Sequence, residues 1–167
     1  MTPVDAFDTM ILMDLTDEAN EAKELIFKEL DFDVDMDVQN FEVSIRIFAG
    51  LLSAYELDSD RRFLSLAEDL GIRLMKAFNS PTGMPYRYVN LKTGATSGPV
   101  SNPAEIGTYL VEYGILSKHT GNPVYYNTAM KAMTALYTLL SPLNLTAEGI
   151  NVETGKVTNP VSHISGC

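Results

Sequence analysis

Residues 40–57 read NFEVSIRIFAGLLSAYEL, and this stretch decides how the chain folds. Its large apolar residues recur every three or four positions, which predicts a helix with a wide apolar stripe. The stripe consists of Phe41, Ile45, Phe48, Leu51, Leu52 and Tyr55. Small residues follow, so a neighbouring helix can approach closely. A helix that is apolar on most sides is typical of the inner layer of a packed assembly.

Glu42 and Arg46 place a carboxylate and a guanidinium near the start of this apolar helix. Side chains four residues apart share one helical face, so the simplest interpretation is an exposed ion pair. The alternative is a functional site at the mouth of the assembly. Spacing alone favours the ion pair.

Length and composition place limits on the function. The 167 residues are 46% hydrophobic, which suffices for one domain with a real core. The formal net charge of −10 argues against nucleic acid and anionic membrane surfaces, and it is compatible with a neutral ligand such as a sugar. No apolar run approaches the roughly 20 residues that a transmembrane helix needs. No signal peptide is visible at the front of the sequence.

The rest of the chain predicts helices joined in pairs by short turns. The expected helices cover residues 2–15, 16–30, 40–57, 61–78, 103–118 and 124–140. Turn residues predict short hairpins at residues 85–94 and 150–160. The acidic run at residues 31–37 is interpreted as a solvated connector, because it lacks the glycine and terminal glutamate of a calcium loop.

These parts recur at a nearly constant interval. Phe63 and Tyr125 are 62 positions apart, and the segments NLKTG and NVETG start 61 positions apart. The repeating unit is an inner helix, a tight turn, an outer helix and a hairpin, and such units bury their apolar faces only by stacking. Either an open solenoid or a closed toroid fits, and the hairpins favour the toroid. Glu42 and Glu105 both lie near inner-helix starts, so in a toroid they share one rim.

Several stretches resemble the inverting α-1,2-mannosidases of glycoside hydrolase family 47, over nearly the whole chain. They are TPVDAFDTMILM, NFEVSIRIFAGLLSAY, LAEDLGIRLMKAF, PTGMPYRYVNLKTG, NPAEIGTYLVEY and NVETGKVTNPVSHI. The resemblance implies an all-α fold of stacked helical hairpins, part of an (α/α)7 barrel with short β-hairpins at one rim. It also implies a calcium ion in the active site and removal of α-1,2-linked mannose from N-glycan-type oligosaccharides.

The resemblance also implies roles for particular residues. Glu42 matches the general acid, which acts through a water, and Arg46 matches an arginine that shapes glycan recognition. Glu105 matches a sugar-contacting carboxylate, and Asp5 and Asp8 match the start of the family's domain. The second catalytic aspartate, the catalytic-base glutamate and the calcium-binding threonine have no counterpart here.

Residues 1–167 are therefore expected to form the first third to half of one catalytic domain, without a second domain, without its own metal ligands and without activity alone. The alternative is a non-catalytic mannose-glycan-binding or helical scaffold protein. The resemblance implies a secretory or extracytoplasmic location. Tyr86, Tyr88, Tyr109 and Tyr113 could stack on sugars, but packing in the core or hairpins is the simpler expectation.

Overall fold

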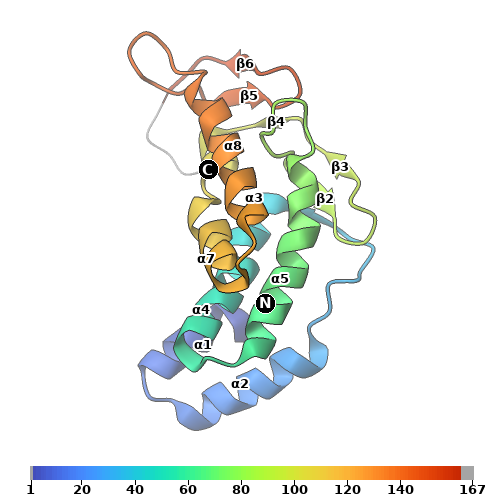
Figure 1. Ribbon diagram of the computed structural model, residues 1–167, viewed down its shortest axis with the longest axis vertical. Coiled ribbons are helices and arrows are strands. Elements are labelled where there is room, and N and C mark those ends of the chain that lie inside the picture. The colour runs from blue at the N-terminus through green and yellow to red at the C-terminus, as the bar shows by residue number, and fades with distance from the viewer. Residues whose placement is uncertain (1, 163–167) are drawn as a thin grey trace.

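The computed structural model describes residues 2–162 and consists mainly of paired helices, with two small sheets at one end (Figure 1). The long helices form three antiparallel pairs: α1 (Thr2–Leu12) with α2 (Thr16–Glu29), α4 (Ala49–Asp58) with α5 (Arg61–Leu74), and α7 (Leu110–Thr120) with α8 (Pro123–Tyr137). The first members also touch one another, α1 with α4 and α4 with α7. They make an inner layer, and α2, α5 and α8 make the outer one. The predicted helix pairs are confirmed.

The first helix is shorter than predicted. It ends at Leu12 rather than at residue 15, because Asp14 adopts a left-handed backbone with φ of 58°. Asp14 N–H then bonds to the carbonyl of Ile11 in a tight turn. The helix predicted over residues 61–78 reaches Phe78, but its last turn, η2 (Met75–Phe78), is a 3-10 helix rather than an α-helix.

The central inner helix is continuous, but it contains a π-helical turn. It runs through α3 (Asn40–Val43), the π turn η1 (Ser44–Phe48) and α4, and the N–H of Ala49 bonds to the carbonyl of Ser44 five residues back. The extra residue in this turn shifts the phase of the apolar stripe. Ile45, predicted to be in the stripe, is 37% exposed, whereas Ile47 is buried. The predicted position of Ile45 was therefore wrong.

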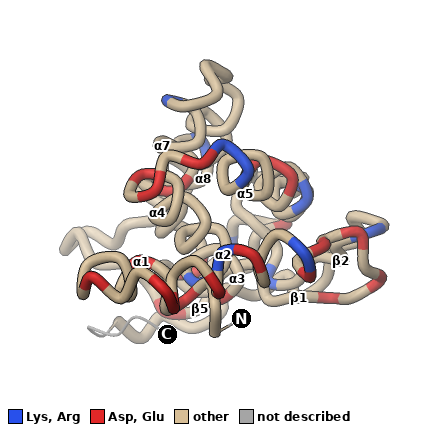
Figure 2. The backbone as a smooth tube through the Cα atoms, turned by 90° about the horizontal axis from the view of Figure 1, so that it is seen from below, with Lys and Arg blue, Asp and Glu red and all other residues tan. Residues whose placement is uncertain are grey.

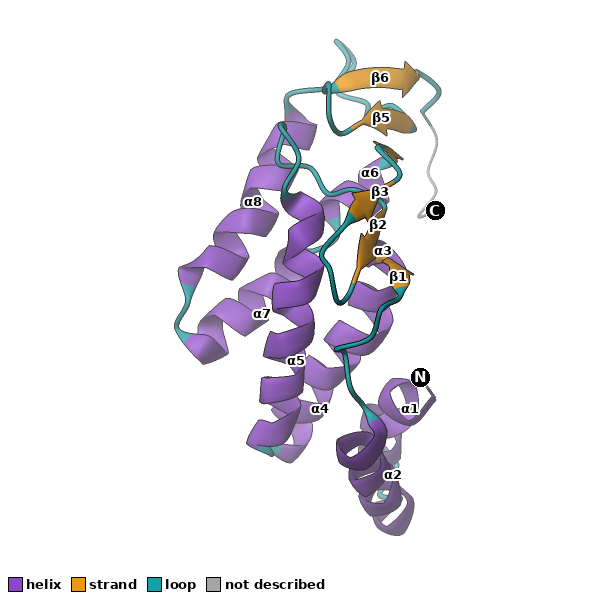
Figure 3. Cartoon of the chain, turned by 90° about the vertical axis from the view of Figure 1, so that its right-hand side faces the viewer, coloured by secondary structure: helices purple, strands orange, loops and turns teal. Residues whose placement is uncertain are grey.

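Both sheets lie at the end where the inner helices start (Figure 3). Each is antiparallel and has three strands. The first sheet has the order β1 (Asp37–Gln39), β2 (Tyr88–Asn90), β3 (Thr96–Ser97). The second has the order β4 (Val100–Ser101), β5 (Gly149–Asn151), β6 (Lys156–Asn159). The two predicted hairpins are confirmed. In each sheet the additional strand, β1 or β4, comes just before an inner helix. Sequence reading missed these strands, because two or three residues are too short to show a period of two.

Aromatic side chains fill the space between the two layers. The ring of Phe63 on α5 is fully buried and lies 4.9 Å from Phe7 and 4.6 Å from Phe27, so it joins α1, α2 and α5. Tyr109 and Tyr113 are also buried, which confirms the simpler expectation that they pack in the core. Within residues 2–162, no helix is long and apolar enough to cross a membrane.

Candidate active site at the rim of the inner helices

The sheets hold two inner-helix starts at the same rim. Asn40 N–H, at the start of α3, donates to the carbonyl of Arg87 at 2.9 Å, beside the β1–β2 ladder. The next inner helix starts with the short α6 (Pro103–Gly107), directly after β4. There the side chain of Asn102 caps the helix by accepting from the N–H of Glu105 at 2.9 Å. Glu42 and Glu105 therefore both lie at the end of the molecule that carries the sheets.

Glu42 and Arg46 form the ion pair that their spacing predicts. Arg46 Nε donates to Glu42 Oε2 at 2.8 Å, and the two side chains are 48% and 41% exposed. The hydrogen bond to Glu42 raises the pKa of Arg46, and the negative charge of Asp5 raises it further. Asp5 of α1 is therefore near enough for its charge to act on Arg46, and the three side chains stay accessible to solvent.

Asp8 extends this row of polar groups along the inner layer. It lies three residues after Asp5 on α1, and its Oδ2 accepts from Ser53 Oγ of α4 at 3.0 Å. Figure 2 shows acidic positions along α1, which carries no lysine or arginine. Asp5 and Asp8, the two aspartates that match the start of the family's domain, therefore lie on the side of α1 that faces the helix carrying Glu42.

Glu105 is arranged differently, because its carboxylate is only 4% exposed. Oε1 accepts from Gln39 Nε2 at 2.9 Å and lies 3.0 Å from Arg87 Nη2, while Oε2 accepts from Ser101 Oγ at 3.0 Å. Gln39 comes three residues before Glu42, so it links the two helix starts. The structure thus brings Glu105 to the predicted rim but turns its carboxylate into the protein.

A groove lies between α1, α4 and α7 in the inner layer. Its volume is about 430 Å³, and it is lined by Asp8, Leu12, Ala49, Leu52, Ser53, Glu56, Leu57, Val111, Glu112 and Ile115. A larger hollow of about 700 Å³ lies by the end of α8 and residues 144–146, and its lining includes no aspartate, glutamate, histidine, lysine or arginine. Because Glu42, Glu105, Asp5 and Asp8, the carboxylates to which the resemblance gives roles, all lie on the inner helices, we place the candidate site there.

Glu112 is a residue that sequence reading missed. Its Oε2 is buried, and it has no hydrogen-bond partner within residues 2–162. Burial raises the pKa of this carboxyl group, which favours a protonated form able to donate a hydrogen bond. The sequence feature that could have pointed to Glu112 is its spacing from Glu105, because seven residues correspond to about two helical turns.

The residues present do not fit a metal site. Within residues 2–162, no group of three or more His, Cys, Asp or Glu side chains could hold a metal ion. Asp8 instead accepts a hydrogen bond from Ser53 Oγ, and the charge of Asp5 acts on Arg46. No step of the chemistry is therefore assigned to a metal bound by this part of the chain.

Residues 1–167 match glycosyl hydrolase family 47 over their whole length. The chain belongs to glycosyl hydrolase family 47. Two similar members of this family are mannosyl-oligosaccharide 1,2-alpha-mannosidase MNS1 of Arabidopsis thaliana, 41% identical, and an endoplasmic reticulum mannosyl-oligosaccharide 1,2-alpha-mannosidase of Rattus norvegicus, 38% identical. These alignments cover 81% and 96% of this chain.

The fold agrees with this family 47 membership. The alpha-1,2-mannosidase from Trichoderma reesei superposes with a TM-score of 0.78 at 27% identity, over 93% of this chain. The match covers 36% of that structure and 25% of each of the two relatives. The chain thus spans about a quarter to a third of the family 47 proteins that it resembles.

Proposed function

We propose that the complete protein is an inverting α-1,2-mannosidase that trims mannose from N-glycan-type oligosaccharides. In this proposal residues 1–167 form one partial domain, and their three helix pairs are consecutive members of an (α/α)7 barrel. The names of the relatives support this reaction, and the stacking of inner helices with sheets at one rim supports the barrel. The observation that carries the proposal is the half-exposed Glu42–Arg46 pair, with Asp5 beside it, at that rim.

Glu42 takes the acid side of the reaction. Inversion at a glycosidic carbon needs two carboxyl groups roughly 6.5–9.5 Å apart, with an attacking water between one of them and the sugar. In this step the Glu42 carboxyl group gives its proton to a water that it holds, and this water protonates the leaving oxygen. The Glu42 carboxylate that results keeps the hydrogen bond from Arg46 Nε. The second carboxylate comes from residues outside this chain, and for that reason we expect no turnover by residues 1–167 alone.

The remaining rim residues bind the sugar. Arg46 uses Nε for Glu42, and its outer nitrogens can donate to mannose hydroxyls. Asp5 and Asp8 can accept from hydroxyls at the edge of the groove. The carboxylate of Glu105 is buried, so we assign it an indirect contact with the sugar through Gln39, whose side-chain amide donates to Glu105 Oε1.

Calcium and a secretory or extracytoplasmic location complete the proposal. The calcium ion that the family resemblance implies is assigned to ligands outside this chain. The rat relative is named as an endoplasmic reticulum enzyme, which supports a location in the secretory pathway or outside the cytoplasm.

The test is mannose release from α-1,2-mannobiose by the complete protein, with calcium added. We expect Glu42→Gln to lower kcat/KM by about 10²–10⁴, the usual contribution of general acid–base catalysis. Glu18→Gln is the matched control, because Glu18 lies in the first turn of the outer helix α2 and is exposed. Near-wild-type turnover by Glu42→Gln would remove Glu42 from the mechanism. Mannose-oligosaccharide binding by the wild type without turnover would favour the non-catalytic alternative.

A further inference from the structure

Arg87 ties the first hairpin to both inner-helix starts. Its carbonyl accepts from Asn40 N–H at 2.9 Å, and its own N–H donates to the carbonyl of Gly98 at 3.1 Å. At the other end of the side chain, Nη2 lies 3.0 Å from Glu105 Oε1. Since both ends of this long side chain are held, the guanidinium has lost much of its rotational freedom before any ligand binds.

The guanidinium keeps donors that the protein does not use. It carries five N–H groups, and within residues 2–162 its contact is the one between Nη2 and Glu105 Oε1. Nε is itself buried, so the donors open to a ligand are those of the two terminal nitrogens. The side chain of Arg87 is 41% exposed, whereas that of Glu105 beneath it is 4% exposed. The outer edge of the fork therefore faces solvent at the rim, backed by a buried carboxylate.

This arrangement suits a neutral polyol better than an anion. The charge of Glu105 offsets that of Arg87, so the pair offers hydrogen-bond donors with little net attraction for a phosphate or carboxylate. The ring of Tyr88 lies near the base of the Arg87 side chain, because a Cβ added to Gly98 would be 3.0 Å from both Arg87 Cβ and Tyr88 Cδ2. Tyr88 is 39% exposed, and an exposed ring on the same hairpin as a guanidinium offers a surface for the apolar face of a pyranose.

We infer that Arg87, with Tyr88, binds a mannose unit of the oligosaccharide that lies beyond the two units joined by the cleaved bond. This inference rests on the proposed function. The terminal mannose must reach Glu42 at the start of α3, while the rest of the glycan leads outward to solvent. The hairpin that carries Arg87 lies at the end of the molecule where the sheets are (Figure 3), and we expect sugars farther along the glycan to pass it.

The experiment compares two substrates of the complete protein. For Arg87→Ala we expect the KM of a high-mannose N-glycan oligosaccharide to rise about tenfold with kcat unchanged, while kcat and KM for α-1,2-mannobiose stay within about twofold. Arg87→Lys keeps a positive charge against Glu105 but loses the planar fork, so we expect the same selective rise in the KM of the oligosaccharide. This variant replaces Arg87→Ala in the test if the alanine variant does not fold. Far-UV circular dichroism checks folding.

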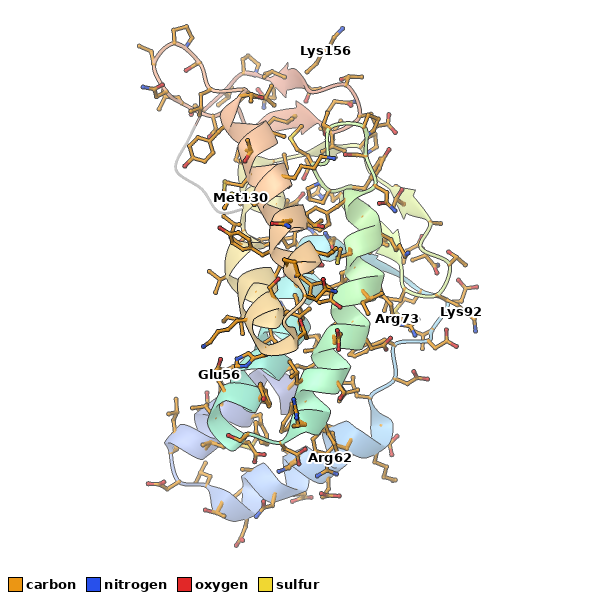
Figure 4. The ribbon with its side chains drawn as sticks, in the orientation of Figure 1. Glu56, Arg62, Arg73, Lys92, Met130 and Lys156 are labelled. Carbon is orange, nitrogen blue, oxygen red and sulfur yellow. The ribbon has the colours of Figure 1, made fainter. Side chains whose placement is uncertain are left out.

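Lys92→Ala is the matched control. Lys92 lies on the turn between β2 and β3 of the same hairpin, and its side chain is 53% exposed and points away from the helices (Figure 4). Its Nζ is 3.7 Å from Asp33 Oδ2. We expect it to leave both substrates within about twofold of the wild type. The inference is overturned if folded Arg87 variants change both substrates equally or change neither. If the wild type releases no mannose from either substrate, the proposed function fails first and the inference falls with it.

Discussion

Replacing Gly50 by alanine tests how α1 is seated on the inner helix that carries Glu42. A Cβ at Gly50 would lie 2.8 Å from Val4 Cγ1 and 3.3 Å from the carbonyl oxygen of Val4. Val4 is 4% exposed and β-branched, so its side chain has little room to turn away. The alanine must push the two helices apart, and Asp5 and Asp8 would move with α1.

Two opposing terms set the size of the effect. Alanine is favoured over glycine in a helix interior by about 0.8–1.0 kcal/mol. Overpacking a tight contact typically costs about 1–3 kcal/mol. We expect Gly50→Ala to lower the free energy of unfolding by about 1 kcal/mol, because the neighbouring atoms include backbone.

Gly114→Ala is the matched variant on the next inner helix. Its added Cβ would meet Tyr126 Cδ2 at 3.7 Å, an ordinary van der Waals contact. With no clash, only the helix-propensity term remains, and we expect a gain of about 0.8–1.0 kcal/mol. The same chemical change should therefore differ by about 2 kcal/mol between the two sites.

Urea unfolding followed by far-UV circular dichroism measures both free energies, with equal m-values as the check on two-state behaviour. If Gly50→Ala stabilises the chain as much as Gly114→Ala does, α1 does not lie against α4 as described, and the placement of Asp5 and Asp8 loses its support.

Three further predictions concern the core and the groove. Phe48→Ala removes a fully buried ring 5.1 Å from Tyr113 and should cost about 3–5 kcal/mol in urea unfolding. Ser53→Ala removes the hydrogen bond to Asp8 and should cost about 0.5–1.5 kcal/mol in the same assay; an unchanged midpoint would contradict that contact. Burial raises the pKa of Glu112, so the folded chain binds that proton more tightly than the unfolded chain, and stability falls as pH rises from the unfolded pKa through the folded pKa. Glu112→Gln should therefore raise the thermal midpoint at pH 7 but not below about pH 4; an equal shift at both would refute the burial argument.

The sequence by itself determined the local architecture of this chain. Helical spacing, turn residues and caps such as Asn102 act within a few positions, so they predict the helix pairs and hairpins without knowledge of the fold. The interval of about 62 residues between matching parts likewise predicts stacked units. The four-residue spacing of Glu42 and Arg46 was enough to predict their ion pair.

Only the tertiary structure decided where the longer-range partners lie. The π turn that exposes Ile45, the short strands β1 and β4, and the burial of Glu105 against Gln39 and Arg87 have no local signature. Gln39 and Glu105 are 66 positions apart, and their hydrogen bond depends on how two helix starts are brought to one rim. Glu112 likewise lies in a groove that exists only when α1, α4 and α7 are assembled. Burial and charge pairing depend on distances in space, which periodicity along a chain does not encode.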